Sequence, residues 1–435
     1  MHILFLTQVL PFPVDAGPKI RAYYTLRYLC QHHRVTLLSF IRLGDPAEAV
    51  EHLRTFCSAV YTVPMERSRF RDGWHLIRSL ATGTPFLIAR DWVPEMAARV
   101  RKLARYDLPF DVIHADQLWM APYALLARQR AMNGRSPAMI LDQHNAVFQI
   151  PARLAQRETN PIKRALLALE GRKLARYEKQ ICRKFDHVVW VTEEDRAALE
   201  AQAINAPLTT STNRRQSMLD GRGSSVIPIC TDPDEQQVIQ RQPDAHRITF
   251  LGGLHWPPNA EGILWFAQEV WPHIAAQVPH TRLTIIGKNP PNGLVEMSGS
   301  HSPIEVTGYV DDATSYLSES AVFIVPLHAG GGMRVKILDA WSWGLPVVST
   351  EVGAEGICTR DGENILLADT SEAFARAVVR VLREPELAIR LAYSGRSTLA
   401  SRYDWRKVYG AWDKVYEQAL GCQAAVPSEQ PVFYR

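Results

Sequence analysis

Short apolar runs rich in β-branched residues alternate with longer segments of helical periodicity along the whole chain. This alternation is typical of parallel sheets whose strands are joined by crossover helices. The runs expected as strands in the first half are 2–7, 35–40, 60–64, 111–116, 138–145 and 187–192. Those in the second half are 248–253, 283–288, 304–310, 322–327, 346–350 and 365–369. Because the runs are largely apolar, we predict an α/β fold of two doubly wound domains with buried parallel sheets.

The chain has 435 residues, which is more than one hydrophobic core usually supports. Segment 203–225 is rich in Thr, Ser, Asn and Gly, so we expect an exposed, mobile loop there, and the polar segment 230–247 is expected to contain the hinge. We predict a first domain over 1–235, a second over 236–402 and a frayed tail over 421–435. Ligands of such sheets bind at the carboxyl ends of strands, so we expect a cleft between the two domains.

Composition narrows the class of protein without naming a function. The net charge of +4 and the sequence pI near 8.7 are mild, and no basic-aromatic cluster suggests nucleic-acid binding. The six cysteines are scattered, with no CxxC pair and no His/Cys cluster at metal-ligand spacing, so we expect a reduced cytoplasmic protein. Residues 1–7 are too short for a signal peptide, and no stretch approaches the ~20 apolar residues of a membrane span.

The clearest chemistry lies in the run 322–350, FIVPLHAGGGMRVKILDAWSWGLPVVST with its preceding valine. It predicts a buried strand, a glycine loop, a helix and a second buried strand. Three glycines leave backbone amides uncovered where the helix begins: Gly330, Gly331 and Gly332. A helix N-terminus with free amides binds anions readily, so this loop predicts a phosphate ligand.

Two cations and a carboxylate follow the glycines. Arg334 and Lys336 lie near the first turn of the expected helix, and Asp339 lies about one turn further along. A helix N-terminus normally favours acidic residues, so two cations there are locally unfavourable unless an anion compensates them. The pattern predicts a nucleotide diphosphate, and the structural alternative is a tight turn with two surface cations.

The order of these motifs resembles the GT-B fold glycosyltransferases, specifically the retaining family 4 group that uses nucleotide sugars. The first-half pieces are QVLPFPVDAGPKIRAYYTLRYL, DQHNAVF and VVWVTEEDRAAL. The second-half pieces are FLGGLHWPPNAEGILWF, GYVDDATSYLSESAVFIVPL and AGGGMRVKILDAWSWGLPVVST. The resemblance spans Met1 to about Leu420 and implies two Rossmann-like domains that face each other across a cleft. It also implies that a terminal helix over 403–420 crosses back from the second domain onto the first.

The resemblance implies transfer of a sugar from a nucleotide-diphosphate sugar, with retention of anomeric configuration and no protein nucleophile. The acceptor implied is a glycan, a lipid-linked sugar or a small molecule, as in polysaccharide biosynthesis. We expect no metal and no other cofactor, because no DxD pair stands in a loop and the pair Asp311 and Asp312 is more typical of a helix cap.

Alternatives to this function remain at the level of sequence. Within enzymes they are a phosphorylase and a nucleotide-sugar epimerase. Outside enzymes the alternative is a catalytically decayed nucleotide-sugar-binding scaffold. It is suggested by Gly331 and Asp339, which stand where many relatives carry two glutamates separated by seven residues. Segment 254–259, LHWPPN, also lacks the Arg and Lys that many relatives use to hold the diphosphate, so that charge has to come from Arg334 and Lys336.

Residue types and the resemblance together assign three groups of site residues. The residues expected to serve the reaction are Arg334, Lys336 and His144. The residues expected to bind the donor are Gly330, Gly331, Gly332, Met333, Asp339, Gly253 and His255. The residues expected near the acceptor and sugar are Asp15, Gly17 and Lys19.

Several nearby residues also have a structural interpretation. His144 at a strand end can be a satisfied structural histidine. The loop 15–19 can be an ordinary strand-to-helix turn, Trp256 can be a core residue and Asn259 can cap a helix. Glu193 and Asp195 after VVWVT are more typical of a helix cap than of chemistry.

Segment 161–185 carries eight basic residues against two acidic ones, with leucines at helical spacing. Such a helix can lie on an anionic membrane leaflet. It can equally be a solvated amphipathic helix packed on the first domain. The expected location is cytoplasmic, with peripheral contact at the inner face of the membrane as a hypothesis for a lipid-linked acceptor.

Overall fold

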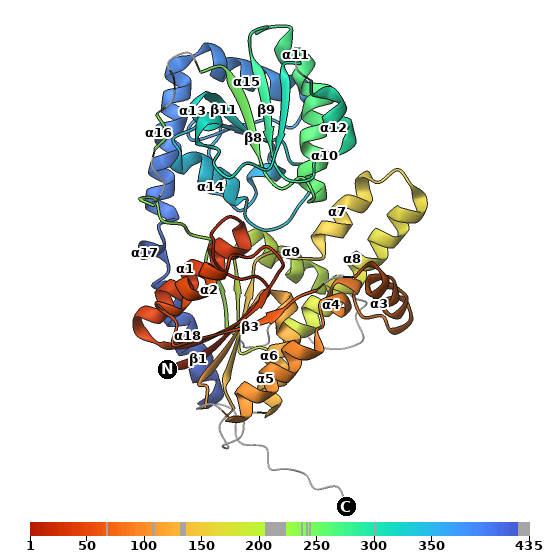
Figure 1. Cartoon of the computed structure of the whole chain (residues 1–435), viewed down its shortest axis with the longest axis vertical. Helices are drawn as coiled ribbons and strands as arrows, with labels where there is room; N and C mark the ends of the chain where they lie inside the picture. The colour runs from red at the N-terminus through yellow and green to blue at the C-terminus, as the bar shows by residue number, and fades with distance from the viewer. Residues whose placement is uncertain are drawn as a thin grey trace, which may run out of the picture. The chain divides into compact units, whose positions relative to one another are not determined.

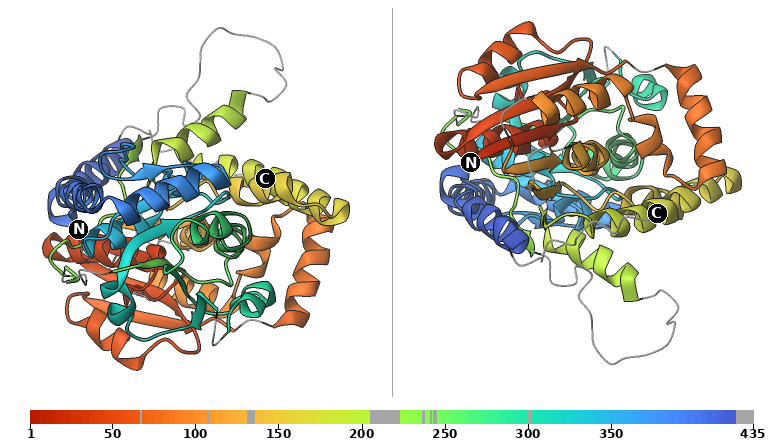
Figure 2. Two further views of the ribbon diagram at one scale, coloured as in Figure 1. Left: turned by 90° about the horizontal axis from the view of Figure 1, so that it is seen from above. Right: turned by 90° about the horizontal axis from the view of Figure 1, so that it is seen from below.

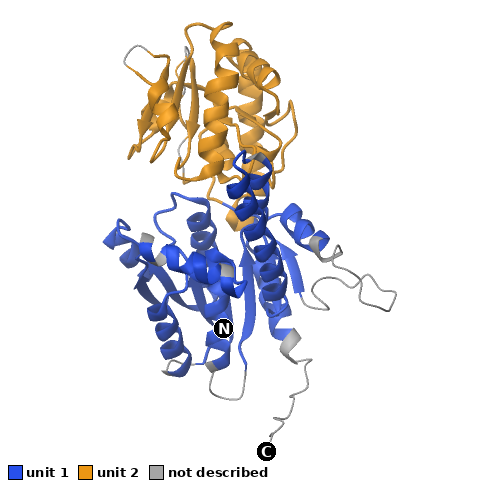
Figure 3. Cartoon of the chain, turned by 90° about the vertical axis from the view of Figure 1, so that its right-hand side faces the viewer, with its two compact units in different colours: residues 1–230, 408–435 blue, residues 231–407 orange. Residues whose placement is uncertain are grey.

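The computed structural model of the protein describes residues 1–66, 68–106, 109–130, 136–204, 223–235, 238–240, 242, 245–299 and 302–424. The chain forms two compact units (Figure 3), one of Met1–Cys230 with Val408–Arg435 and one of Thr231–Lys407. Each unit contains one parallel sheet covered by helices (Figure 1). The predicted α/β class with two doubly wound sheets is therefore confirmed.

The sheet of the first unit has seven strands in the order β3-β2-β1-β4-β5-β6-β7, all paired in parallel. The strands are β1 His2–Thr7, β2 Arg34–Ile41, β3 Ala59–Pro64, β4 Val112–Asp116, β5 Ala138–Gln143, β6 His187–Trp190 and β7 Gly223–Val226. The direction of winding reverses between β1 and β4, which are neighbours although β2 and β3 intervene in sequence. Loops that leave such a switch point diverge, which leaves room for a ligand.

Sequence patterning missed one strand, the edge strand β7. Its residues, GSSV, are small and mostly polar, and they pair with the buried strand β6. An edge strand has one unpaired side and needs little apolar surface, so hydrophobicity did not reveal it. Most of the expected mobile loop at 203–225 lies outside the described residues, as does the predicted tail from 425 onward.

The helices of the first unit cover both faces of its sheet (Figure 2). They are α1 Gly17–His32, α2 Ala47–Arg54, α3 Arg69–Thr82, α4 Phe86–Arg90, α5 Pro94–Tyr106, α6 Ala121–Arg130, α7 Gln149–Arg157, α8 Pro161–Cys182, α9 Glu193–Ile204 and α18 Ala411–Ala424. Helix α18 packs on β5, β6 and β7, and its residues Trp412 and Tyr416 are fully buried. The end of the described chain thus belongs to the first unit.

The sheet of the second unit has six parallel strands in the order β10-β9-β8-β11-β12-β13. They are β8 Arg247–Leu251, β9 Arg282–Ile286, β10 Ile304–Gly308, β11 Ser320–Val325, β12 Val347–Ser349 and β13 Leu366–Leu367. Here the winding reverses between β8 and β11. Every apolar run expected as a strand, in both halves of the chain, overlaps a strand of the structure.

The second unit's helices complete its two outer layers. They are α10 Pro257–Trp265, α11 Trp271–Ala275, α12 Asn292–Met297, α13 Thr314–Ser318, α14 Val335–Ser342, α15 Ser371–Arg383 and α16 Pro385–Arg402, with α17 Trp405–Val408 at the junction with the first unit. A π-helical turn, Phe266–Val270, joins α10 to α11. Among the described residues, each helix is too short or too polar to reach across a bilayer.

Candidate functional site

The glycine loop between β11 and α14 has the conformation that its sequence requires. Gly330 has φ of 137° and Gly332 has φ of 72°, a region that strains any residue with a Cβ. Within the described residues, the amides of Gly331, Gly332 and Met333 have no hydrogen-bond partner. These three N–H groups directly precede α14 and lie at the switch point of the second sheet, so they can bind an anion.

Arg334 holds this loop together. Its buried guanidinium donates from Nη1 to the carbonyl of Gly331 at 2.6 Å and to that of Gly332 at 2.7 Å, while Nη2 lies 3.9 Å from a carboxylate oxygen of Glu355. These contacts fold the side chain back over its own turn. In this arrangement Arg334 shapes the loop that presents the amides, rather than extending a fork away from it.

Lys336 is the cation that lies beside the loop after β8. Its Nζ donates to Asn259 Oδ1 at 2.9 Å and lies 4.5 Å from the ring centroid of Phe250. Burial, and next the charge of Arg334, lower the pKa of Lys336 to about 7. A bound anion such as phosphate would favour the charged ammonium and would therefore raise this pKa.

The structural interpretation of Asn259 as a helix cap is wrong, because α10 begins at Pro257 and its N-cap residue is Trp256. The side chain lies in the first turn of the helix, where Nδ2 donates to the carbonyl of Gly253 at 2.9 Å and Oδ1 accepts from Lys336. Asn259 therefore connects the loop that follows β8 to the first turn of α14, the helix that follows β11. Strands β8 and β11 are the two at the switch point. Sequence reasoning missed this role because the two segments are far apart along the chain.

The remaining donor candidates surround this connection. Asp339 lies one turn beyond Lys336, is half-buried, and has a pKa raised by burial to about 7, against the opposing charge of Lys336. His255 is exposed just after Gly253, and Trp256 is 43% exposed, so the interpretation of Trp256 as a core residue is wrong. The structure thus brings the second-domain candidates together at one edge of one sheet.

His144 lies at the carboxyl end of β5 in the first unit. Its Nε2 lies 2.8 Å from Asp116 Oδ1, at the end of β4, and 3.8 Å from Asp142 Oδ2. Burial raises the pKa of Asp116, and His144 opposes that shift. The histidine is therefore oriented by a carboxylate, an arrangement found in catalytic and structural histidines alike.

A buried ion pair stands behind His144. The guanidinium of Arg21 donates to both oxygens of Asp142, at 2.9 and 3.1 Å, and to the carbonyl of Pro228 at 2.7 Å. It also lies 4.9 Å from the ring of Trp412 on α18. Although burial opposes ionisation, Arg21 and the neighbouring histidines hold the pKa of Asp142 below its usual value. Sequence analysis did not single out Arg21, Asp116 or Asp142, although charges inside apolar runs were a visible signal.

Polar atoms without partners gather around this switch point. Within the described residues, the buried atoms lacking a hydrogen bond include Thr7 Oγ1, Asp116 Oδ2, Gln117 Nε2 and His144 Nδ1. They lie at or just after the ends of β1, β4 and β5. Because buried polar groups are normally satisfied, their convergence is typical of a site that receives a polar ligand.

The same cluster offers donor atoms to a metal ion. One ligand atom each from Asp116, Asp142 and His144 lies within 4.8 Å of the others. Both oxygens of Asp142, however, already accept hydrogen bonds from Arg21, whose positive charge disfavours a neighbouring cation. This donor set fits a metal poorly.

The expected capping residues are found near helix starts. Asp312 Oδ1 accepts from the amide of Thr314 at 2.8 Å, at the beginning of α13. Asp195 forms a reciprocal pair with Thr192, since its amide donates to Thr192 Oγ1 at 3.0 Å while its carboxylate accepts from that hydroxyl at 2.6 Å. Asp195 Oδ1 also accepts from the amide of Ala146, two residues beyond His144.

The acceptor candidates occupy the loop between β1 and α1. Gly17 is the first residue of α1, and Lys19 Nζ lies 3.0 Å from Asp15 Oδ1 and 4.0 Å from Asp45 Oδ1. The charge of Lys19 is thus balanced by two carboxylates inside the same unit. Its geometry fits a strand-to-helix turn as well as a ligand contact.

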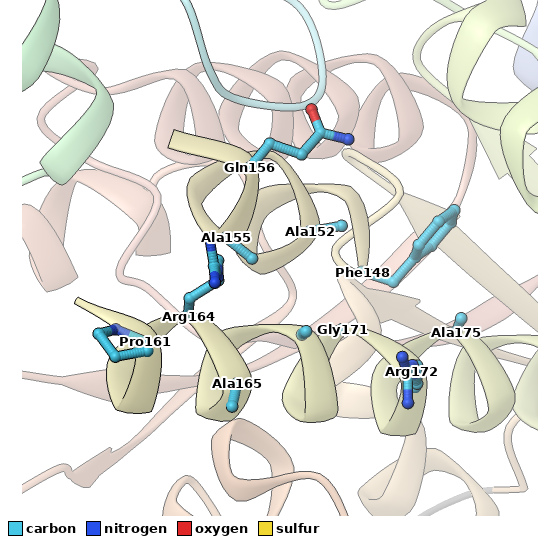
Figure 4. Close-up of a pocket in the computed structure, with 11 residues that line it drawn as sticks. Phe148, Ala152, Ala155, Gln156, Pro161, Arg164, Ala165, Gly171, Arg172 and Ala175 are labelled. Atoms are coloured by element: carbon cyan, nitrogen blue, oxygen red, sulfur yellow. The ribbon is translucent and has the colours of Figure 1, made fainter. Parts of the chain in front are cut away.

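A groove lies between α7 and α8 in the first unit (Figure 4). Its volume is about 720 Å³. Its walls are mainly small and apolar, and its residues are Phe148, Ala152, Ala155, Gln156, Pro161, Arg164, Ala165, Ala168, Gly171, Arg172 and Ala175. Arg164 and Arg172 are the charged groups in this lining.

Each of the two doubly wound units has polar groups at its switch point. Proteins with such sheets bind their ligands at this edge, beyond the carboxyl ends of the strands. Comparison with solved structures specifies the class further. Sucrose-phosphate synthase from Thermosynechococcus elongatus superposes with a TM-score of 0.67 at 17% identity, covering 97% of this chain and 100% of that one. HepE from Anabaena, solved with UDP and glucose, gives a TM-score of 0.60 at 13% identity over 96% and 99% of the two chains.

Residues 245–384 match the family model described as glycosyl transferases group 1. The chain has the GT-B fold of these solved structures, and the family model matches this segment of its second unit.

Curated relatives match over shorter stretches. An uncharacterized protein of the cps region of Klebsiella pneumoniae is 29% identical over 38% of this chain and 44% of its own length. The lipopolysaccharide core biosynthesis glycosyltransferase LpsE of Rhizobium meliloti is 31% identical over 26% and 34%. The phosphatidyl-myo-inositol mannosyltransferase of Mycobacterium leprae is 28% identical over 39% and 46%. The chain therefore spans less than half the length of these three relatives.

Proposed function

We propose that the protein is a retaining, metal-independent glycosyltransferase that moves a sugar from a nucleoside-diphosphate sugar to a glycan, lipid-linked or small-molecule acceptor. One observation carries the proposal: the amides of Gly331, Gly332 and Met333 lack partners directly ahead of Lys336, inside the segment matched by the family model. The solved complex of HepE with UDP-glucose supports a nucleotide sugar as the ligand. The name of LpsE, a lipopolysaccharide core biosynthesis glycosyltransferase, favours a role in polysaccharide assembly.

The chemistry of transfer fits the groups around the glycine loop. Breaking the anomeric C–O bond leaves negative charge on the departing diphosphate, so the site has to stabilise that charge. The loop amides supply fixed dipoles, and Lys336 supplies a cation whose pKa rises when an anion binds. Arg334 keeps the loop in its conformation, and Asp339 is assigned to the ribose of the nucleotide.

The first unit supplies the proposed partner of the sugar. In a retaining reaction without a protein nucleophile, the acceptor attacks from the face that the diphosphate leaves. His144 is assigned to the transferred sugar, because Asp116 orients its ring and unsatisfied polar atoms surround it. The poor fit of a metal to the cluster with Asp142 supports a reaction that uses protein cations instead.

The first test of this function is a panel of UDP-, GDP-, ADP- and dTDP-sugars, measured by thermal shift and by hydrolysis. The wild type is compared with Lys336→Met, Arg334→Ala and the exposed control Arg360→Ala. We expect one donor to stabilise the wild type and the control, and Lys336→Met to lose most of that shift. Binding without any turnover, even with added acceptor glycans, would instead favour the decayed scaffold.

A further inference from the structure

The first unit exposes two apolar stripes on neighbouring helices. On α3 the stripe is Phe70, Trp74 and Ile77, whose side chains are 88%, 62% and 63% exposed. On α8 it is Ile162, Leu166 and Leu169, the first of which is 73% exposed. Both sets have the spacing i, i+4, i+7, which places their members on one face of a helix. Isolated exposed apolar residues are ordinary, but two such stripes are not.

The C-terminal end of α3 approaches α8, and the two helices run across each other in Figure 2. Lys173 of α8 donates from Nζ to the carbonyl and the hydroxyl of Ser79 on α3, at 2.8 and 3.1 Å. Ser79 is buried, whereas the residues of α3 around its stripe are largely exposed. The helix is therefore attached by one edge and keeps its apolar face uncovered.

The charge around the stripes is positive. The exposed basic residues of the two helices include Arg78, Lys163, Arg172 and Arg176. Arg164 lies about half a turn from the α8 stripe, in the lining of the groove beside α7. Both acidic residues of α8 have internal partners: Glu170 accepts from the amide of Leu87, and buried Glu178 accepts from the amides of Val147 and Phe148. The acidic residue of α3, Asp72, is half-buried. The groove rimmed by Arg164 and Arg172 lies along the same helix, α8.

We propose that α3 and α8 form a docking surface for an anionic lipid bilayer, with the two apolar stripes inserted below the headgroups and the basic residues against them. Apolar insertion combined with headgroup attraction is the physical basis of interfacial helix binding, and a second copy of the chain would not explain the excess of positive charge. The inference adds a surface to the proposed function and relies on that function only for its consequence, which is access to a lipid-linked acceptor.

The test is flotation of the full chain with phosphatidylcholine vesicles, with and without phosphatidylglycerol. We expect flotation with the anionic vesicles only, and a fall in the partition coefficient of at least about tenfold in the triple variant Phe70→Ser, Trp74→Ser, Ile77→Ser. The matched control is Ile389→Ser, Tyr393→Ser on α16, two exposed apolar residues of the second unit. Since all these side chains are exposed, each variant should unfold at the wild-type temperature.

Three results would overturn the proposal: no flotation of the wild type, equal flotation with neutral vesicles, or unchanged flotation of the α3 variant. Self-association in sedimentation, lost in the α3 variant without any vesicle binding, would assign the surface to a second copy instead. Donor hydrolysis measured on the same variants separates the two proposals, because it should be unchanged whether or not the surface binds lipid.

Discussion

The two switch points build their sites by different means. At the switch point of the first unit, the site is formed by buried side chains. Asp116 orients His144, and the ion pair of Arg21 and Asp142 lies behind His144. At the second, the backbone of the loop from Gly330 to Met333 presents its amides, and the cation beside it has a lowered pKa. In the first site, the charges of the protein's own side chains balance one another. In the second site, the balancing negative charge has to come from a ligand.

The largest effect is expected from breaking the buried ion pair of the first unit. Asp142→Asn keeps the shape of the side chain but leaves the guanidinium of Arg21 buried without a counter-charge. Loss of one partner of such a pair costs about 3–5 kcal/mol. Urea unfolding should show that loss. The control Arg360→Ala removes an exposed pair with Glu363 and should change stability by less than about 1 kcal/mol. Similar stabilities for the two variants would contradict the account of the first site.

The second site should lose activity rather than stability when its cation is removed. Lys336→Met keeps the length of the buried stem, so the fold should be retained, while turnover of the donor selected by the panel should fall about 100-fold. Steady-state kinetics with a saturating acceptor measures this. A change of less than threefold would show that Lys336 does not serve the leaving group.

A smaller effect is expected from the loop backbone. Gly332→Ala adds a Cβ at a φ of 72°, where the left-handed conformation costs a non-glycine residue about 1–2 kcal/mol. Since the loop amides act only in this conformation, donor affinity should fall by roughly tenfold, as titration calorimetry would show. Gly362→Ala has a similar φ of 75° outside the site and serves as the matched control, with a stability loss but unchanged donor affinity.

The smallest expected effect is the uptake of a proton when the donor binds. An anion beside Lys336 should raise its pKa from about 7, so donor binding should take up a fraction of a proton, and affinity should fall as the pH rises above about 7. The stability of the free protein should instead increase as the pH rises above about 7. Because the unfolded lysine keeps its proton to about pH 10, the unfolded chain binds more protons between about pH 7 and 10, and stability rises across that window.

Calorimetry in two buffers of different ionisation enthalpy measures the uptake. Lys336→Met should abolish it, and Asp339→Asn should be run in parallel because Asp339 titrates in the same range. Uptake that persists in Lys336→Met would assign the proton to another group.

The apolar runs and the glycine loop were sufficient to predict both parallel sheets and the edge at which Gly330, Lys336 and Asp339 gather. Those features depend on local periodicity and on backbone preferences, which a sequence displays directly. Tertiary structure alone decided that Asn259 holds Lys336, that Arg334 folds back on its loop, and that Asp116 faces His144 with Arg21 and Asp142 behind. These contacts depend on which segments the chain crossovers bring together and on which rotamers the side chains adopt. The hydrophobic pattern of the sequence carries no information about either.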